Sequence, residues 1–390
     1  MQITTEQEQL RERAIDLART ELAPHAHVCD ETGAFPERSL ELFKEHGFTG
    51  MCVPKEYGGQ GLGILEACLA LEGIAHGCMS SAMALQGNLN GPWRVIAEIG
   101  TEEQKKRYLP EVADGSRMFA IAMTEPNAGS DGLAMETTLT PDGDGFQLTG
   151  TKCHITGGDR SDTIMVFCRA PGTVGPYGIG VVLVERGTPG FEVLEIERKM
   201  GGRGMNEVVL GFDKVPVRPD QVVMMPDAGS KAGAQFLLVQ FNPERCGNAA
   251  MSLGLGQAAF DYALDYTKKR HQFGRSVAEF QGIQWKFADM AVGLESARLL
   301  LWRAASSDEG GFPVTRHTAM AKLHCNEVGI SVCNEAIGLL GHKGYLMDHP
   351  VERYFRDVRG MAIAGGTVDI QRNILGSAVT GIKTSQRPSA

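Results

Sequence analysis

The stretch GFQLTGTKCHIT, residues Gly145–Thr156, alternates apolar and polar side chains over much of its length. This alternation is typical of a half-buried antiparallel strand. Short apolar runs rich in β-branched residues lie on both sides of it: MFAIAMT (118–124), TIMVFCRA (163–170), YGIGVVLVE (177–185) and EVVLGFD (207–213). Turn-forming sequences such as PDGDG and PGTVGP separate the runs. The pattern predicts an antiparallel β-domain over residues 117–226.

Helical periodicity replaces this pattern on the N-terminal side, and we expect a helical domain over residues 1–116. Thr4 or Thr5 can cap a first helix. One face of that helix is apolar, at Leu10, Ala14, Leu17, Ala18 and Leu22. The run FPERSLELFKEHGF has Pro36 where a helix starts and Gly47 where it stops. The run TEEQKKRYLPEVADG (101–115) is interpreted as an exposed last turn and a linker.

Long helical patterns return over residues 227–390. The first is expected to run without a break over residues 232–270, and two more cover residues 280–307 and 315–341. Long helices with apolar stripes are typical of a helical bundle. We therefore predict an α+β protein with an N-terminal helical domain, a middle antiparallel β-domain and a C-terminal four-helix bundle.

The composition argues against several classes of partner. Lys plus Arg number 38 and Asp plus Glu 47, and the net charge of −9 disfavours nucleic acid. No apolar run reaches the roughly 18 residues that a membrane span needs. The N-terminus MQITTEQEQLRERAIDLA lacks the apolar core of a signal peptide, so we expect a cytoplasmic protein. The nine cysteines lack metal-binding or redox spacing, so we expect reduced thiols and no metal site.

Two glycine-containing stretches indicate places where a ligand can approach the backbone. AIAMTEPNAGSDG, residues 120–132, offers N–H groups and hydroxyls in a turn after a predicted strand. Such a loop either holds a planar heterocycle or a thioester arm, or is an ordinary cluster of turns. GMAIAGGTVDIQRNIL, residues 360–375, ends a small apolar run with Gly365 and Gly366. That corner supplies no acid or base at its centre.

Four segments in register resemble the acyl-CoA dehydrogenase family: MTEPNAGSD (123–131), TGTKCHITGG (149–158), KKRHQFGRSVAEFQGIQ (268–284) and GGTVDIQRNIL (365–375). The resemblance covers essentially the whole chain and includes the order of helical, β and helical zones. It implies an FAD enzyme that desaturates an acyl-CoA thioester between its α and β carbons. It also implies a homotetramer with an electron-transfer flavoprotein as electron acceptor.

Six positions match family residues that contact the flavin ring: Ile121, Met123, Thr124, Ser130, His154 and Thr156. Ser130 matches a position that contacts both the flavin and the pantetheine arm of the substrate, and Thr156 matches the threonine that faces flavin N5. His154 stands where the family commonly has Trp or another aromatic residue. An imidazole is smaller and titrates near neutrality. His154 therefore either tunes the flavin or fills the wall of the site.

Eight further positions match family segments that bind FAD, several of them from a neighbouring subunit: Arg270, Gln272, Phe273, Gln281, Gly338, His342, Thr367 and Asp369. Arg270 suits a pyrophosphate because a guanidinium pairs with phosphate oxygens. Three positions depart from the family pattern. Gly338 and Asp369 replace glutamines, and His342 replaces a glycine. The backbone at Gly338 and His342 is still expected to contact the adenine side of FAD.

The commonest family members carry a catalytic glutamate where this chain has Gly365. In another branch, which includes isovaleryl-CoA dehydrogenase, the glutamate comes from the first helix of the C-terminal domain and precedes an arginine. This chain has Glu244 and Arg245 there, in FNPERCGNAA (241–250). The resemblance thus implies that Glu244 removes the α proton. It places four residues against the substrate: Ser130, Asn242, Arg245 and Gly366. Without the resemblance, Glu244 is interpreted as a surface residue that pairs within its helix.

Other functions stay open at this point. The acyl group can be attached to a carrier protein instead of CoA, the flavin chemistry can be of the lyase or hydroxylase type, or the protein can be a non-catalytic flavoprotein. The presence of Glu244, Arg245 and Arg270 together favours a dehydrogenase. The sequence does not identify the acyl group, although the lack of an arginine at Ser80–Ser81 disfavours a dicarboxylic substrate.

Overall fold

The computed structural model describes residues 2–382, and the chain divides into two compact units. Unit 1 contains residues 64–79 together with the described residues up to 27 and from 242 onward. Unit 2 contains residues 28–63 and 80–241. Each unit is therefore built from segments that are far apart in the sequence.

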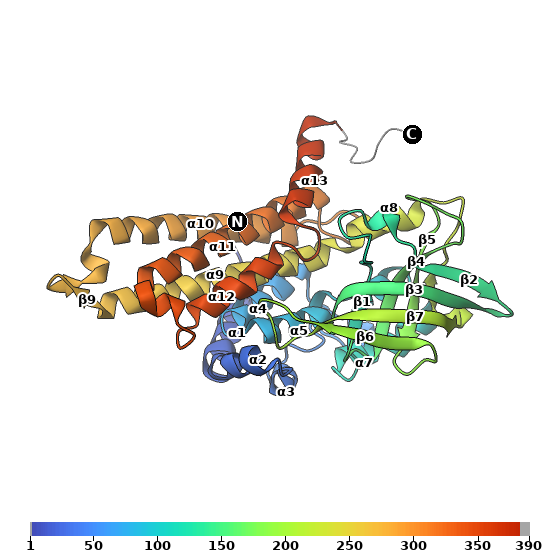
Figure 1. Cartoon of the computed structure of the whole chain (residues 1–390), viewed down its shortest axis with the longest axis horizontal. Helices are drawn as coiled ribbons and strands as arrows, with labels where there is room; N and C mark the ends of the chain where they lie inside the picture. Colours follow the sequence, from blue (N-terminus) through green and yellow to red (C-terminus); the bar gives the residue numbers. More distant parts are fainter. Residues whose placement is uncertain (1, 383–390) are drawn as a thin grey trace. The chain divides into compact units, whose positions relative to one another are not determined.

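Unit 1 is helical, and a bundle of long helices forms most of it (Figure 1): α9 (Asn242–Lys269), α10 (Gln281–Ala305), α11 (Thr315–Leu340) and α12 (Val351–Met361). A further helix, α13 (Val368–Thr380), packs on α11. The helix α4 (Ile64–Ala75) packs on both α9 and α1 (Thr5–Leu17). Short elements complete the unit: η1 (Ala18–Leu22), η2 (Ala23–His25), β9 (His271–Gln272), β10 (Arg275–Ser276), η6 (Val277–Glu279) and η7 (Gly341–Tyr345).

The first helix, α1, forms as the sequence predicts. The Thr4 hydroxyl accepts a hydrogen bond from the Gln7 N–H, and the Gln7 side chain accepts one from the Thr4 N–H, which completes a capping box. The predicted apolar face is buried along its whole length. It lies close against α4, because a Cβ built on Gly73 would be 2.5 Å from the Cβ of Ala14.

The expectation of one unbroken helix over residues 232–270 is wrong. The chain forms α8 (Ala232–Gln240), in unit 2, and then α9, with a break at Phe241. Pro243 explains the break, because proline lacks an N–H and is tolerated in the first turn of a helix but not in its interior. A new helix therefore starts at Asn242 and carries Glu244 in its first turn.

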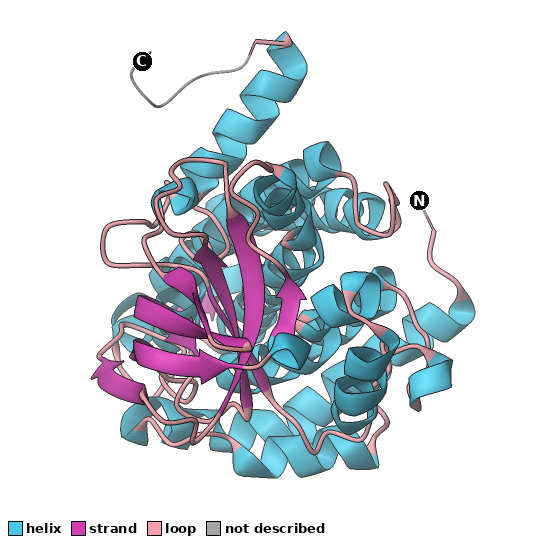
Figure 2. Cartoon of the chain, turned by 90° about the vertical axis from the view of Figure 1, so that its right-hand side faces the viewer, coloured by secondary structure: helices cyan, strands magenta, loops and turns pink. Residues whose placement is uncertain are grey.

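A mostly antiparallel sheet, magenta in Figure 2, forms the centre of unit 2. The strands follow the order β6-β7-β3-β2-β4-β5-β8, and β1 pairs in parallel with β4. Five strands match the predicted runs: β1 (Phe119–Ala122), β3 (Gly145–Thr156), β4 (Thr163–Arg169), β5 (Ile179–Glu185) and β7 (Glu207–Val217). Three more were not predicted: β2 (Thr138–Asp142), β6 (Phe191–Glu197) and β8 (Val222–Met224). The first of these contains Pro141, and β6 is an exposed edge strand in which glutamates and apolar residues are mixed.

Apolar side chains on one face of the sheet form its core. The strand β4 is buried at every position, and β5 at all but its last. The alternation in β3 buries Leu148 and Ile155, which pack with Leu210 of β7 and Val182 of β5. The sheet is thus a stable platform for the loops at its ends.

Unit 2 also contains helices: α2 (Ala26–Thr32) and α5 (Met79–Asn90), which lie mostly in this unit, then α3 (Glu37–Glu45), α6 (Trp93–Ile99), α7 (Glu102–Ala113), α8, η3 (Lys55–Tyr57), η4 (Gly132–Ala134) and η5 (Pro219–Gln221). The interpretation of residues 101–115 as a last turn and linker is wrong. Thr101 and Gln104 form a capping box for α7. Tyr108 and Leu109 are fully buried, and this burial keeps the segment helical despite Pro110.

The predicted fold class is confirmed, because helical segments precede and follow the antiparallel sheet in the chain. The helices N-terminal to the sheet are divided between the two units. All nine cysteines lie within the described residues, where each is buried and none forms a disulfide bond.

Candidate active site

The first turn of α9 carries the predicted base, Glu244. Its side chain is partly buried. Burial raises the pKa of Glu244 to about 7, against the opposing effects of the nearby Arg245 and Lys322 cations. A carboxyl group that titrates near neutrality is suited to accept a proton at physiological pH. The environment of Glu244 therefore differs from that of a surface glutamate paired within its helix.

Arg245 connects the start of α9 to the glycine pair. Its side chain is buried, and its Nε donates a hydrogen bond of 3.1 Å to the carbonyl oxygen of Gly365. Its Nη1 donates to Oδ1 of Asn242 at 3.1 Å. Asn242 in turn donates to the carbonyl oxygen of Pro313 at 2.9 Å and to Oγ1 of Thr315 at 3.0 Å. The structure thus brings Asn242, Arg245 and the glycine pair together.

The glycine pair has a backbone that other residues rarely adopt. Gly365 and Gly366 have φ angles of +67° and +91°. A Cβ built on Gly366 would lie 3.0 Å from Nε2 of Gln371, which donates a hydrogen bond of 3.1 Å to the Gly366 carbonyl. Thr367 then caps α13, since its Oγ1 accepts from the Ile370 N–H at 3.2 Å. A side chain at either glycine would be strained.

A lysine that no motif indicated, Lys322 of α11, lies beside this cluster. Its side chain is fully buried, and a Cβ built on Gly365 would lie 3.7 Å from its Cε. Burial and the Arg245 cation lower the pKa of Lys322 to about 7, while the Glu244 carboxylate opposes the shift. The sequence does contain a signal, because Lys322 interrupts the apolar face formed by Ala319 and Cys325.

In unit 2, a buried ion pair supports the backbone of the predicted flavin segment. Nζ of Lys152 lies 2.8 Å from Oε1 of Glu125 and donates a hydrogen bond of 2.8 Å to the carbonyl oxygen of Met123. The Cys153 N–H donates to the carbonyl oxygen of Thr124 at 3.0 Å. The segment after β1 therefore lies directly beside the end of β3.

The end of β3 contains a bulge at the position of His154. The pairing of β3 with β7 shifts register between Lys152 and Ile155, and His154 has a positive φ of 57°. Its Nδ1 lies 2.7 Å from Oε1 of Glu197, whose Oε2 accepts the His154 N–H at 2.9 Å. Bulges of this kind are common next to active sites, where they direct a side chain outward. The imidazole is exposed here.

The other predicted flavin residues of unit 2 are accessible to a ligand. Ile121, Met123 and Thr124 are partly buried, whereas Ser130 and Thr156 are exposed. Within the described part of the chain, the side chains of the two threonines and of Ser130 have no hydrogen-bond partner in the protein. Their hydroxyls can therefore bind a ligand without breaking an existing contact.

The predicted neighbour-contacting residues lie at the opposite end of α9 from Glu244. Arg270 follows the last turn of α9, and the hairpin of β9 and β10 presents Phe273 at its tip, 94% exposed. Gln272 and Gln281 are also exposed. The helix between Glu244 and Arg270 is roughly 39 Å long at 1.5 Å per residue. These residues thus cannot reach Glu244 of their own chain.

The remaining predicted cofactor residues are dispersed on unit 1. Gly338 and His342, at the end of α11 and in η7, are exposed. A Cβ built on Gly338 would meet no described atom within 4 Å, so its environment is open. Asp369 is exposed and accepts a hydrogen bond of 3.2 Å from Arg372.

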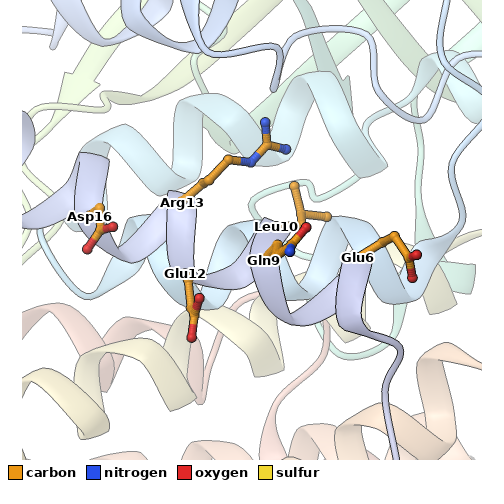
Figure 3. A pocket seen from close by; sticks show the side chains of 6 residues that line it. All are labelled: Glu6, Gln9, Leu10, Glu12, Arg13 and Asp16. Atoms are coloured by element: carbon orange, nitrogen blue, oxygen red, sulfur yellow. The ribbon is translucent and has the colours of Figure 1, made fainter.

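One surface pocket has no comparable arrangement of buried ionisable groups. It lies along α1 and is lined by side chains of that helix alone (Figure 3): Glu6, Gln9, Leu10, Glu12, Arg13 and Asp16. Among residues 2–382 we find no group of three His, Cys, Asp or Glu side chains arranged to hold a metal ion. No helix in this range is long and apolar enough to span a membrane.

Three family models match consecutive parts of the chain. The model described as "Acyl-CoA dehydrogenase, N-terminal domain" matches residues 4–116. Those of the middle domain and of the C-terminal domain match residues 120–215 and 231–380.

Curated relatives match almost from end to end. The chain is 36% identical to a short-chain specific acyl-CoA dehydrogenase of Clostridium acetobutylicum, over 97% of this chain and 98% of the relative. It is 39% identical to a 3-sulfinopropanoyl-CoA desulfinase of Paraburkholderia xenovorans, over the full length of both.

Solved structures show the same fold. Butyryl-CoA dehydrogenase from Megasphaera elsdenii superimposes with a TM-score of 0.92 at 32% identity, covering 97% of this chain and 99% of that one. A glutaryl-CoA dehydrogenase from Mycobacterium smegmatis in complex with FADH2 gives a TM-score of 0.90 at 25% identity, covering 98% and 96%.

Proposed function

Because the chain belongs to the acyl-CoA dehydrogenase family, it is an FAD-dependent oxidoreductase of acyl-CoA thioesters, and we propose that Glu244 is its catalytic base. The observation that supports this most strongly is the pairing of two positions. Gly365 has no side chain, and Arg245, which follows Glu244, donates a hydrogen bond to its carbonyl oxygen. We propose that the Glu244 carboxylate of α9 uses the space into which Gly365 projects no side chain.

Abstraction of the α proton needs a base of moderate strength and stabilisation of the enolate that forms. A pKa of about 7 gives Glu244 a substantial ionised fraction at neutral pH. The proton passes from the α carbon to a carboxylate oxygen of Glu244. The Gly366 N–H, in a turn fixed by Arg245 and Gln371, is proposed to donate to the thioester carbonyl oxygen.

The residues present in unit 2 fit a flavin ring. FAD, when bound, accepts the hydride from the β carbon. Thr124 and Thr156 offer hydroxyls without a protein partner in the described residues, and the ion pair of Lys152 and Glu125 keeps the Met123 backbone in place. We assign to the flavin the further contacts predicted from the sequence, by Ile121, Ser130 and His154. Ser130 is also assigned to the substrate, with Asn242 and Arg245.

We further propose that subunits share their FAD sites in a homotetramer. The exposed hairpin with Arg270 and Phe273 cannot reach the proposed base of its own chain. In addition, α10 exposes large apolar side chains two turns apart: Trp285 (62% exposed), Val292 (71%) and Leu299 (39%). An exposed apolar stripe of this kind is typical of a protein contact. Gln272, Gln281, Gly338, His342, Thr367 and Asp369 are assigned to cofactor contacts in this assembly.

An electron-transfer flavoprotein is proposed as the electron acceptor, in a cytoplasmic location. A solved structure described as "Electron transferring flavoprotein of Acidaminococcus fermentans: Towards a mechanism of flavin-based electron bifurcation" matches this chain at 34% identity with a TM-score of 0.92, covering 97% of this chain and 99% of that one. The description applies to that protein. It supports the proposal because a chain with the fold of this protein occurs in a structure that concerns an electron-transferring flavoprotein.

The test is the purified protein itself, which should be yellow and release FAD on denaturation. A panel of straight, branched and carrier-protein-bound acyl thioesters, with an artificial electron acceptor, then identifies the substrate by kcat/KM. The panel should include 3-sulfinopropanoyl-CoA, because one relative at 39% identity is a desulfinase of that compound. Release of sulfite without acceptor reduction would favour the lyase-type alternative over dehydrogenation. Colourless protein that stays without FAD when FAD is added would contradict the proposal.

A further inference from the structure

The proposed reaction does not use Lys322, although this lysine is among the largest fully buried side chains of the described residues. Its Nζ donates to Oδ1 of Asn326 and to the carbonyl oxygen of Met361, both at 3.1 Å. Met361 is the last residue of α12, and the turn that follows leads directly to Gly365. Lys322 therefore connects α11 to the start of the glycine turn.

These hydrogen bonds continue into a buried polar network between α9, α11 and α12. Asn326 donates to Oδ1 of Asn248 at 3.0 Å and to Oγ of Ser252 at 2.7 Å. Asn248 donates to the same Met361 carbonyl that accepts from Lys322, at 3.1 Å. Buried networks with satisfied partners hold side chains in one arrangement. The Lys322 amine is thus fixed in place.

The charged groups around Lys322 are those of the proposed active site. Arg245 and Glu244 face it from α9. On the side of α12, the Lys322 amine donates to the carbonyl oxygen of Met361, and the turn after α12 contributes Gly365, which has no side chain. A Cβ built on Gly365 would lie 3.7 Å from Cε of Lys322 and 3.9 Å from Cγ of Arg245, so the two cationic side chains flank this position.

We propose that Lys322 is a positioning residue for the reaction, which orients the glycine turn through the Met361 carbonyl and holds Glu244 in its ionised form. The inference rests on the proposed role of Glu244. Lys322 acts through Glu244 and the turn, and it exchanges no proton with the substrate.

Two consequences follow from the burial of this amine. A cation close to Glu244 lowers the pKa of the carboxyl, so removing the cation should raise that pKa further above its ordinary value. A buried amine also costs stability when it is charged. At Lys322, the unfolded chain binds one more proton than the folded chain between about pH 7 and the usual lysine pKa of about 10.4. The contribution of this residue to the free energy of unfolding should therefore increase with pH in that window.

The test compares Lys322→Met, which removes both the charge and the hydrogen bonds, with Lys322→Gln, which keeps an uncharged donor. Lys55→Met, at an exposed lysine of unit 2, is the control. Each FAD-loaded variant is mixed anaerobically with the best acyl-CoA of the panel, and the rate of flavin reduction is measured from pH 5.5 to 9.5. Unfolding by urea of each variant is followed over the same pH range.

Both Lys322 variants should move the midpoint of the pH profile upward by about 1 unit, because Glu244 loses a nearby cation. The rate of flavin reduction at pH 6.5 should therefore fall roughly tenfold. This loss should disappear near pH 9, where Lys322 of the wild type is itself neutral. Lys322→Gln should keep more of the plateau rate than Lys322→Met, because glutamine retains an N–H donor for the Met361 carbonyl oxygen. The control should follow the wild type. Relative to both Lys322 variants, the wild type should gain stability as the pH rises from 7 to 9.5.

A profile that is only scaled by a constant factor, or that coincides with the wild type, would overturn the proposal and leave Lys322 a purely structural role. If one variant does not retain FAD, the other supplies the same comparison. If neither does, the urea series decides, since equal changes of stability between pH 7 and 9.5 in the wild type and in both Lys322 variants also reject the proposal. The Glu244→Gln variant tests the base assignment separately. If Glu244 is not the base, this variant reduces its flavin at the wild-type rate; otherwise it does not.

Discussion

Arg245 Nε and the carbonyl oxygen of Gly365 are joined by a hydrogen bond of 3.1 Å, although the two residues are 120 positions apart in the sequence. The contact connects the first turn of α9, which carries Glu244, to the turn before α13. It brings together the two segments that the proposed site of Glu244 and Gly365 requires.

The rate of flavin reduction by an acyl thioester should depend on pH with a midpoint near 7. The pKa of Glu244 is raised to about 7, mainly by burial, and only the ionised carboxylate accepts the α proton. The rate should therefore be low at pH 5.5 and increase to a plateau above pH 8. Anaerobic stopped-flow absorbance of the flavin measures this profile, and a rate independent of pH between 5.5 and 8.5 would be inconsistent with it.

Gly365→Glu should impair the wild-type reaction. The φ of +67° strains any side chain there, and the new carboxylate would enter between Lys322 and Arg245, where we propose that Glu244 acts. Two carboxylates at one site cannot both ionise easily, so one should be protonated. The double variant Glu244→Gly with Gly365→Glu should recover a measurable part of the activity. If Gly365→Glu alone is as active as the wild type, the reaction does not require a residue without a side chain at position 365.

Arg270→Ala should weaken FAD retention and the oligomer more than the fold of the subunit. Arg270 is exposed beside the hairpin of β9 and β10, where its loss removes no described contact of the core. Gel filtration with absorbance at 280 and 450 nm gives both quantities. A wild-type monomer that keeps its full FAD at micromolar concentration would contradict the shared site.

Lys152→Met should destabilise the protein by about 3–5 kcal/mol, because it leaves the buried Glu125 without its cationic partner. The variant should also lose FAD more readily, since the Met123 backbone loses a hydrogen bond. Lys269→Met is the control. It breaks an exposed pair with Asp265 and should change stability by no more than about 1 kcal/mol. Urea unfolding of both proteins in excess FAD provides the comparison.

Sequence patterns predicted the fold well where periodicity and capping agree. The Thr4 cap, the buried face of α1 and five strands of the sheet follow directly from spacing and turn residues. The predictions failed where tertiary packing outweighs local preference. Burial of Tyr108 keeps α7 helical through Pro110, and Pro243 begins a second helix where the apolar pattern alone is continuous.

The candidate site was predicted in part. The family motifs indicated Glu244, Arg245 and Gly365, and the structure brings Arg245 and Gly365 into contact. Lys322 was missed, because a lysine in a helical pattern is usually solvated and only the packing of α11 against α9 and α12 buries it. The partnership of His154 with Glu197 was also missed, since a bulge between two strands has no signal in the periodicity of either.

The most direct measurement is the anaerobic rate of flavin reduction by a substrate thioester in Glu244→Gln, with Glu327→Gln as a control that removes an exposed carboxylate of α11. The amide is nearly isosteric but accepts no proton at neutral pH. We predict that Glu244→Gln retains FAD and binds the thioester but reduces its flavin roughly 100-fold to 10,000-fold more slowly than the wild type, while the control is unaffected. Wild-type rates in Glu244→Gln, with a thioester that the enzyme demonstrably oxidises, would contradict the assignment of Glu244 as the base.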